Sequence, residues 1–357
     1  MPAAPREVTV ALTPRARFDV IDVRAEAARQ HGDALDEFQN CLYCSFHTTA
    51  GYLDQSLASR LGRQGNGVEA YVGAFRTVFP EGADYRHDNM EERSELTDAQ
   101  RVVEPRNGDS HLGFMAAGLK PVVTYQNIPG GPVSFVDLDG MQADQRPRRR
   151  VTTVVGYAAE EVVARVRISI PVSNHPLDSV NLKDPRLGFY EQLAEMIGRF
   201  GVGKGRLRLD LASKERHVGL TVNEYETLLM QHDLTEVMRN PVRFVAERGR
   251  HALHDPRLVP TKTLGYAKYD LVRALNEALD ALGLSESLVE RILAKMMGVP
   301  AERFFRMKRS VSLLVSDRQR DGRGAIVEGT YQSPILVQWR SSETRMREIE
   351  ATLTRFV

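Results

Sequence analysis

The sequence has little cysteine and no long apolar run. Its only cysteines, Cys41 and Cys44, are too few for a disulfide framework in 357 residues. No stretch of 18 apolar residues is present, the length needed to cross a bilayer as a helix. Residues 1–8 also lack the apolar core of a signal peptide. We therefore expect a cytoplasmic protein without a membrane partner.

An excess of either charge is also missing. Lys and Arg total 48 against 47 Asp and Glu, a formal net charge of +1, so no overall field attracts nucleic acid, and we expect no such partner. The composition, 42% hydrophobic and 27% charged, is that of an ordinary globular protein, and 357 residues are enough for two cores. We predict two domains, residues 1–157 and 158–357.

The two cysteines form a Cys-x-x-Cys motif next to His47. A redox pair needs this motif at the start of a helix, whereas residues 42–47 are apolar and aromatic enough for a strand. On a strand Cys41 and His47 lie about 20 Å apart and Cys44 points to the other face, which argues against a zinc knuckle. We predict two half-buried strand cysteines.

Three histidines stand in short polar segments beside apolar runs. The segments are Phe46-His47-Thr48-Thr49-Ala50, Tyr85-Arg86-His87-Asp88 and Asp109-Ser110-His111-Leu112. Asp88 and Asp109 place a carboxylate near each later histidine, where it can orient an imidazole. Three neutral imidazoles that converge form a zinc-type site with an open position. Spacings of 40 and 24 residues form no local metal motif, however, so structural histidines are the alternative.

These motifs resemble those of the YjbQ-type family, the secondary thiamine-phosphate synthases. The matching segments occur in the family's order over about residues 8–156: His47-Thr48-Thr49-Ala50, Tyr85-x-His87-Asp88, Ser110-His111-Leu112, Gln126-x-Ile128, Asp139-Gly140 and the strand from Arg150 to Gly156. The resemblance implies a compact α+β domain that assembles as a trimer, with the histidines lining a cleft suited to a metal. Some members of the family are linked to the joining of a pyrimidine pyrophosphate to a thiazole phosphate, which is the activity that the resemblance implies. Residues 51–55 and 123–127 depart from the family around the cleft.

Candidate site residues follow from the motifs and from one charge run. Arg148 and Arg150 belong to a run of arginines that enters a predicted strand, and arginine forks suit phosphate, although such runs are more often solvated. Asp137 and Asp139 alternate on a strand as an acid–base pair or as solvated charges, and we favour solvation for one of them. We predict metal ligands His47, His87 and His111, catalytic residues Asp88, Thr49 and Gln126, and substrate-binding residues Thr48, Arg86, Arg148 and Arg150.

Periodicity predicts an α+β fold: an N-terminal antiparallel-sheet domain with flanking helices, and a C-terminal mixed helix and strand domain. The predicted N-terminal strands are residues 7–13, 18–23, 42–47, 121–126, 133–138 and 151–155, with helices in 22–39, part of 53–79 and 112–117. In the C-terminal part we predict a helix-to-strand passage or one long strand at 160–172, and strands at 206–211, 304–315 and 325–339. Helices are predicted at 187–200, 221–238 from a capping box, 241–251, 269–282, 288–297 and 342–353, and residues 201–205 as a hairpin turn.

Two functions are compatible with this sequence. In the first, the chain is an enzyme, a metal-dependent transferase or a hydrolase or lyase relative, that acts on a small polar or phosphorylated and possibly heterocyclic substrate at the three histidines. The metal would be a divalent ion, zinc first. In the second, the chain is a non-catalytic oligomeric binding or assembly protein whose C-terminal domain is the recognition surface. We favour the enzyme because of the histidine motifs.

Overall fold

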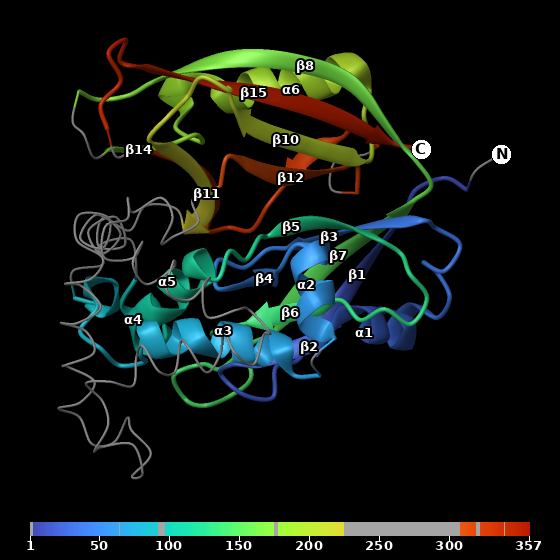
Figure 1. Cartoon of the computed structure of the whole chain (residues 1–357), viewed down its shortest axis with the longest axis vertical. Coiled ribbons are helices and arrows are strands. Elements are labelled where there is room, and N and C mark those ends of the chain that lie inside the picture. The colour runs from blue at the N-terminus through green and yellow to red at the C-terminus, as the bar shows by residue number, and fades with distance from the viewer. Residues whose placement is uncertain are drawn as a thin grey trace, which may run out of the picture.

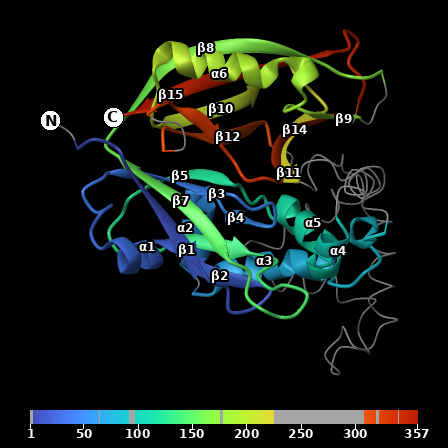
Figure 2. The same cartoon turned by 180° about the vertical axis from the view of Figure 1, so that it is seen from behind.

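The computed structural model describes residues 3–63, 65–91, 97–174, 178–224, 308–318, 322–338 and 340–357. Their strands form four sheets in which every neighbouring pair is antiparallel. Helices accompany these sheets, so the predicted α+β class is confirmed. The two halves of the chain form two layers, one above the other in Figure 1 and, from behind, in Figure 2.

The N-terminal half is built on a four-stranded sheet. Its order is β1 (Arg6–Leu12), β7 (Arg150–Tyr157), β3 (Asn40–Ser45) and β5 (Val122–Gln126). A second sheet holds β2 (Asp19–Asp22), β6 (Ser134–Asp137) and β4 (Ala50–Tyr52). In β1 the side chains of Val8, Val10 and Leu12 alternate into the core, as a strand with one buried face requires.

Helices flank these sheets. They are α1 (Val23–His31), α2 (Gln55–Gly62), α3 (Gly67–Val78), the 3₁₀ helix η1 (Arg86–Asp88), α4 (Asp98–Val103) and α5 (Gly108–Ala116). The Asp22 carboxylate caps α1 by accepting from the backbone N–H groups of Arg24 and Ala25. Helices α1 and α3 lie on the side of the N-terminal half that faces away from the C-terminal half (Figure 1).

The C-terminal half has a five-stranded sheet with one helix against it. The order is β13 (Ala325–Val327), β12 (Ser310–Ser316), β10 (Gly205–Leu211), β15 (Met346–Phe356) and β8 (Glu160–Pro171). A smaller sheet joins β11 (Val218–Glu224), β14 (Gln332–Gln338) and β9 (Asp178–Asn181). After η2 (Pro185–Leu187), helix α6 (Phe189–Phe200) packs its apolar face on the core and ends at Gly201, whose φ of 59° favours glycine.

Several predicted elements are wrong. Residues 342–353, predicted as a helix, belong largely to β15, where Ile349, Ala351 and Leu353 alternate into the core. The proposed capping box at Thr221 lies inside β11, because pairing with β14 outweighs the local helix signal. Residues 201–205 connect α6 to β10 and form no hairpin, and residues 325–339 contain two strands, β13 and β14. The predicted helices 241–251, 269–282 and 288–297 lie outside the described residues.

The two halves share a hydrophobic cluster. Leu42, Val122 and Val155 of the N-terminal sheet pack there with Leu314 and Val327 of the C-terminal one. Tyr157 and Phe356 stack across it with ring centroids 3.9 Å apart. Cys41 and Cys44 lie in different clusters, each 1% exposed and unpaired with the other, so they are fully buried where half-burial was predicted. None of the described helices has the length and apolar character needed to span a membrane.

Candidate functional site

Helix α5 brings one candidate histidine and one candidate carboxylate together. All nine of its residues are buried, including His111 in the first turn. The Asp88 carboxylate Oδ1 accepts hydrogen bonds from the backbone N–H groups of Asn107, at 2.9 Å, and Gly108, at 2.8 Å. A Cβ atom on Gly108 would lie 2.8 Å from Tyr85 Cβ, so only glycine fits this approach. Asp88 therefore occupies the positive end of α5.

The Asp88 carboxyl is suited to proton exchange near neutral pH. Its residue is only 8% exposed, and burial raises the pKa to about 7. The hydrogen bonds from Gly108 and Asn107 act the other way, and the neighbouring Asp109 charge raises the pKa further. A capping carboxylate without this burial would stay ionised, so burial decides the result here.

His87 and His111 form a closely packed pair. Their ring centroids are 4.7 Å apart and the planes cross at 72°, with the residues 0% and 1% exposed. His87 Nε2 lies 3.1 Å from Asn107 Oδ1, which only accepts, so this nitrogen carries the proton. Asn107 Nδ2 in turn donates to Asp139 Oδ2 at 2.9 Å. The histidine pair is thus linked through Asn107 to the Asp139 carboxylate, which follows β6.

The arginines of this region are paired with buried carboxylates. Arg150 donates to both Asp137 oxygens, at 2.7 and 2.9 Å, and Arg148 contacts Asp139. Arg17 holds Asp109 through two hydrogen bonds of 2.8 and 2.9 Å. The expectation that one of Asp137 and Asp139 is solvated is wrong, since both are 0% exposed. Arg150, the first residue of β7, is not solvated either, since its side chain is 3% exposed and pairs with Asp137.

Asp139 keeps one oxygen without a partner. Its Oδ1 atom is buried and forms no hydrogen bond with any described residue. Burial raises the pKa of Asp139, while the charges of Arg148, Arg150 and Arg17 and the Asn107 hydrogen bond lower it. A buried carboxylate oxygen without a hydrogen bond lowers the stability of the fold. Such groups are typical of functional sites.

His47 lies just beyond the end of β3 and faces different partners. Its Nε2 atom accepts a hydrogen bond of 3.1 Å from the backbone N–H of Val151. Burial, together with the charges of Arg150 and Arg148, lowers the His47 pKa to about 3. The ring is therefore neutral at pH 7, and its Nε2 lone pair is already engaged.

Of the remaining predicted residues, Gln126 lies away from the others. Thr49 is buried in the loop before β4, where its carbonyl accepts from Leu138, while Thr48 is half-buried and Arg86 exposed. Gln126 is exposed and pairs with Asn40 at the opposite end of β3 from Ser45, the last strand residue before His47. The structure therefore brings together His87, Asp88 and His111, places His47 beside Arg148 and Arg150, and leaves Gln126 away from both.

Sequence reasoning missed Arg17 and Asn107. The segment Asn107-Gly108-Asp109-Ser110 is an N-terminal helix signal, and it would have placed the start of α5 four residues before the predicted residue 112. No local signal identifies Arg17, because its partner Asp109 lies 92 residues away in sequence.

The described donors do not fit a three-histidine metal site. Among the residues that the structure describes, no group of three His, Cys, Asp or Glu side chains is placed to hold an ion. One reason is visible at His47, whose Nε2 lone pair already accepts from Val151, so that its other ring nitrogen carries the proton of the neutral ring. The divalent metal, zinc included, stays a prediction, and the chemistry proposed below involves only the chain's own residues.

Comparison with known proteins adds a likeness to solved structures. No family model and no curated protein matches the chain. A YbjQ-like protein of unknown function from Sulfolobus solfataricus matches at 13% identity over 55% of this chain and 99% of its own, with a TM-score of 0.29. An uncharacterized yjbq/upf0047 family protein from Clostridium acetobutylicum matches at 11% identity over 54% and 99%, with a TM-score of 0.26. A conserved hypothetical protein from Thermus thermophilus matches at 16% over 55% and 100%, with a TM-score of 0.22.

The names of two of these structures are those of the family that the histidine motifs resemble, and their matches cover 55% and 54% of this chain. TM-scores far below 0.5 carry no argument about the site. The contacts of the chain itself are therefore the basis for its function.

Proposed function

We propose that this chain is an enzyme that transfers a proton to or from a small polar or phosphorylated substrate, with Asp88 as the acid–base group. The observation that supports this most is the Asp88 carboxyl, nearly closed from solvent and with a pKa of about 7 beside the His87 and His111 pair. A general acid or base works best when its pKa lies near the working pH.

The neighbours of Asp88 suit such a role. Arg86, exposed in the same 3₁₀ helix, is a cation able to contact an anionic substrate. Arg148 and Arg150 are less suited to gripping phosphate, because buried carboxylates already compensate their charges. Transferase, lyase and hydrolase reactions all need a proton at a leaving group or a nucleophile, so Asp88 serves each of them equally.

The proposal is tested with the variant Asp88→Asn. The amide oxygen of asparagine still accepts from Asn107 and Gly108, so α5 keeps its cap while the titrating group is removed. Turnover in a panel of phosphorylated heterocycles and other small polar compounds should fall about 10²- to 10⁴-fold. The exposed neighbour Asp84→Asn is the matched control and should keep wild-type turnover.

A second readout needs no substrate. Carbon-13 NMR of labelled aspartate follows the titration of the Asp88 carboxyl directly, with the Asp88→Asn spectrum assigning the signal. A midpoint near 7 supports the acid–base role, and a midpoint near 4 contradicts it.

The binding or assembly function is the second candidate. The burial of His87 and His111 favours it, since closed imidazoles are often structural. This function would be favoured over the enzyme if Asp88→Asn kept wild-type turnover and the Asp88 carboxyl of the wild type titrated with a midpoint near 4. Both candidate functions are compatible with the trimer that the family resemblance implies. The molecular mass in solution measures this oligomeric state.

A further inference from the structure

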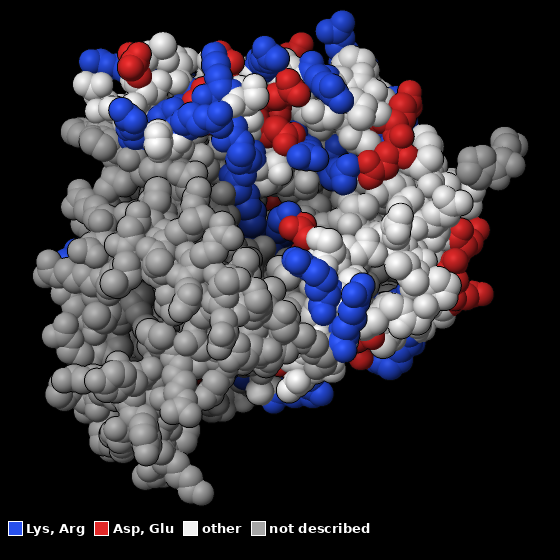
Figure 3. Space-filling view, in the orientation of Figure 1, with Lys and Arg blue, Asp and Glu red and all other residues white. Residues whose placement is uncertain are grey.

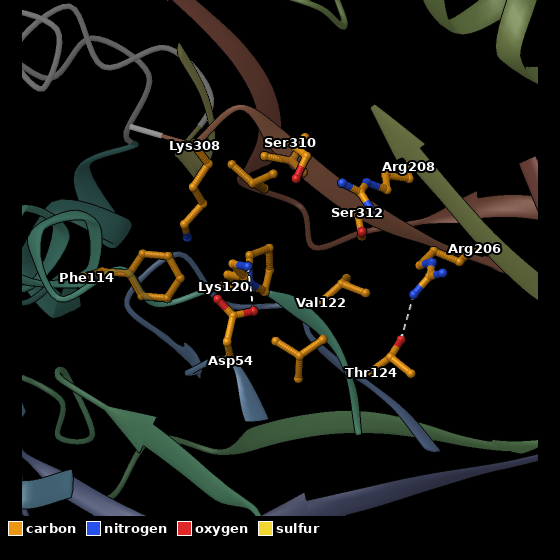
Figure 4. A pocket seen from close by; sticks show the side chains of 14 residues that line it. Asp54, Phe114, Lys120, Val122, Thr124, Arg206, Arg208, Lys308, Ser310 and Ser312 are labelled. Atoms are coloured by element: carbon orange, nitrogen blue, oxygen red, sulfur yellow. Dashed lines mark hydrogen bonds and ion pairs between the residues drawn. The ribbon is translucent and has the colours of Figure 1, made fainter. Parts of the chain in front are cut away.

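A cavity of about 250 Å³ lies between the two halves of the chain. Its floor comes from the N-terminal half, with residues of β5 and the segment just before it, and its roof comes from β10 and β12. Figure 3 shows Lys and Arg side chains around a hollow between the two layers, and Figure 4 shows the lining from close by. This cavity is separate from the Asp88 site, although α5 contributes to both through His111 and Phe114.

Strand alternation explains why polar groups face the cavity. In β10, Leu207 and Leu209 point into the core of the C-terminal half, so Arg206 and Arg208 emerge on the other face. In β12, Val311 and Leu313 belong to the same core. Ser310 and Ser312 line the cavity, and Ser312 lies directly across from Arg208 in the sheet. The contact between the two halves thus encloses a polar face formed by strands β10 and β12.

The charge of this lining is strongly unbalanced. Four of the residues that line the cavity are cationic and one is acidic; they are Lys120, Arg206, Arg208, Lys308 and Asp54. Asp54 pairs with Lys120 at 2.5 Å. The carboxylates that reach the two arginines, Glu160 at 2.7 Å and Asp210 at 2.9 Å, do not line the cavity. Among the lining side chains, cationic ones therefore outnumber acidic ones by three when Lys308 is protonated.

Among the described residues, carboxylates pair with Lys120, Arg206 and Arg208, and none pairs with Lys308. Its amino group points into the cavity toward Phe114 and the Lys120–Asp54 pair (Figure 4), and it donates to the Leu119 carbonyl. It also lies 6.0 Å from the centroid of the Phe114 ring. Burial of the amino group and the nearby Lys120 charge lower the pKa of Lys308 to about 7, although Asp54 acts against this. An anion beside this amine would stabilise its charged form.

Arg206 contributes a guanidinium with one unpaired donor among the described residues. Its terminal nitrogens donate to Thr124 Oγ1, at 2.9 Å, and to Glu160, at 2.7 Å. Its Nε atom is buried and has no hydrogen-bond partner among the described residues. Buried donors are normally satisfied, and the described residues supply no acceptor for this one.

We propose that this cavity binds a small divalent oxyanion, the phosphate group of a phosphate monoester, through Lys308, Lys120 and the arginines, with the Ser310 and Ser312 hydroxyls as further donors. A dianion matches the excess positive charge better than a single carboxylate does. The volume leaves room for a small organic group beyond the phosphate, against Val122, Val222 and Phe114. This site is independent of the acid–base role of Asp88.

Isothermal titration calorimetry of the full chain tests the proposal, with sulfate as a dianion that does not titrate near neutral pH and inorganic phosphate in a second arm. Both should bind, with acetate at least tenfold weaker. Lys308→Met should weaken sulfate binding about tenfold or more, because a charge-assisted hydrogen bond is lost. Lys214→Met, at an exposed lysine paired with Glu348, is the matched control and should bind like the wild type.

The Lys308 amine gives a second, specific readout. Above pH 7 the free amine is largely neutral and takes up a proton when the dianion binds, which titrations in two buffers of different ionisation enthalpy detect. Lys308→Arg should retain binding without proton uptake, since arginine is always charged. The other charged groups that line the cavity, Asp54, Lys120, Arg206 and Arg208, are unchanged in both variants. Absence of sulfate and phosphate binding, acetate binding as tight as sulfate, or wild-type binding by Lys308→Met would each overturn the proposal.

Discussion

The imidazole rings of His87 and His111 lie edge to face, with their centroids 4.7 Å apart, although 24 residues separate them in sequence. Helix η1 supplies one ring and the first turn of α5 the other. Their common neighbourhood also holds Asp88, whose carboxylate caps α5. His47 lies instead with Val151 and the arginines that precede and begin β7. Two of the histidines thus pack ring against ring, and His47 has other contact partners.

Metal content is the first measurement that follows from this arrangement. The described residues hold no group of three His, Cys, Asp or Glu side chains placed to bind an ion, and the Nε2 lone pair of His47 already accepts a protein hydrogen bond. We therefore expect elemental analysis to find the same metal content in the wild type and in His87→Ala. One zinc or other divalent ion per chain that is lost in His87→Ala, with the fold intact by circular dichroism, would contradict this and would restore the predicted three-histidine site.

Asp88 should make stability fall as the pH rises. Burial raises the folded-state pKa to about 7, while an unfolded aspartate titrates near 4. Between these values the folded chain keeps a proton that the unfolded chain has lost, so stability present below pH 4 is lost as the pH rises through 7. Urea denaturation from pH 4 to 8 should show this loss for the wild type relative to Asp88→Asn. Parallel curves for the two proteins would show that Asp88 does not titrate in this window.

His47 should act in the opposite direction. Its folded-state pKa of about 3 lies below the value near 6.5 of an unfolded histidine. The stability that neutral His47 contributes is therefore present above pH 6.5 and lost as the pH falls toward 3. The variant His47→Gln keeps an acceptor for the Val151 N–H group but cannot titrate. Relative to it, the wild type should lose stability on acidification, measured by thermal unfolding in a pH series. An equal acid sensitivity of both proteins would argue against a buried neutral imidazole.

The Arg150–Asp137 pair should be important for stability. Both side chains are almost fully buried, so Arg150→Met leaves an uncompensated carboxylate and should lower the free energy of unfolding by about 3–5 kcal/mol. Arg146→Met removes an exposed pair with Asp144 and should cost no more than about 1 kcal/mol.

A double variant separates charge burial from substrate contact at this position. Arg150→Met combined with Asp137→Leu removes both charges and should recover most of the lost stability. Unchanged stability in Arg150→Met, with turnover alone reduced, would instead favour the predicted phosphate contact. Chemical denaturation followed by circular dichroism measures these differences.

Some elements could be predicted from local pattern, and others could not. The alternation of residues 160–172 left a long strand or a helix-to-strand passage open, and the structure has the long strand β8. The apolar face with a terminal glycine predicted α6. The same reasoning failed for β15, whose many charged residues imitate a surface helix. There, Arg347 is buried because it pairs with Glu215 of the segment between β10 and β11, a partner 132 residues away. Local polarity cannot reveal such long-range compensation.

The candidate site shows the same division. The residues flanking His87 and His111 put a carboxylate close to each of them in sequence. In the structure, however, His87 Nε2 contacts Asn107, and Asp109 pairs with Arg17. The arginine partners, the orphaned Asp139 oxygen and the remoteness of Gln126 depend on which strands pair and where they end. A strand register determines these distances, and register is a property of the assembled sheet.

By itself, the sequence determined the α+β class, the likeness of residues 8–156 to one family, and a set of histidines with adjacent carboxylates, because short-range periodicity and motifs are written in neighbouring residues. Only the tertiary structure decided that His87 and His111 pack together while His47 contacts Val151, that the arginines are compensated, and that a cationic cavity lies between the halves. Burial and charge pairing set these outcomes, and both depend on residues that meet only when the chain is folded.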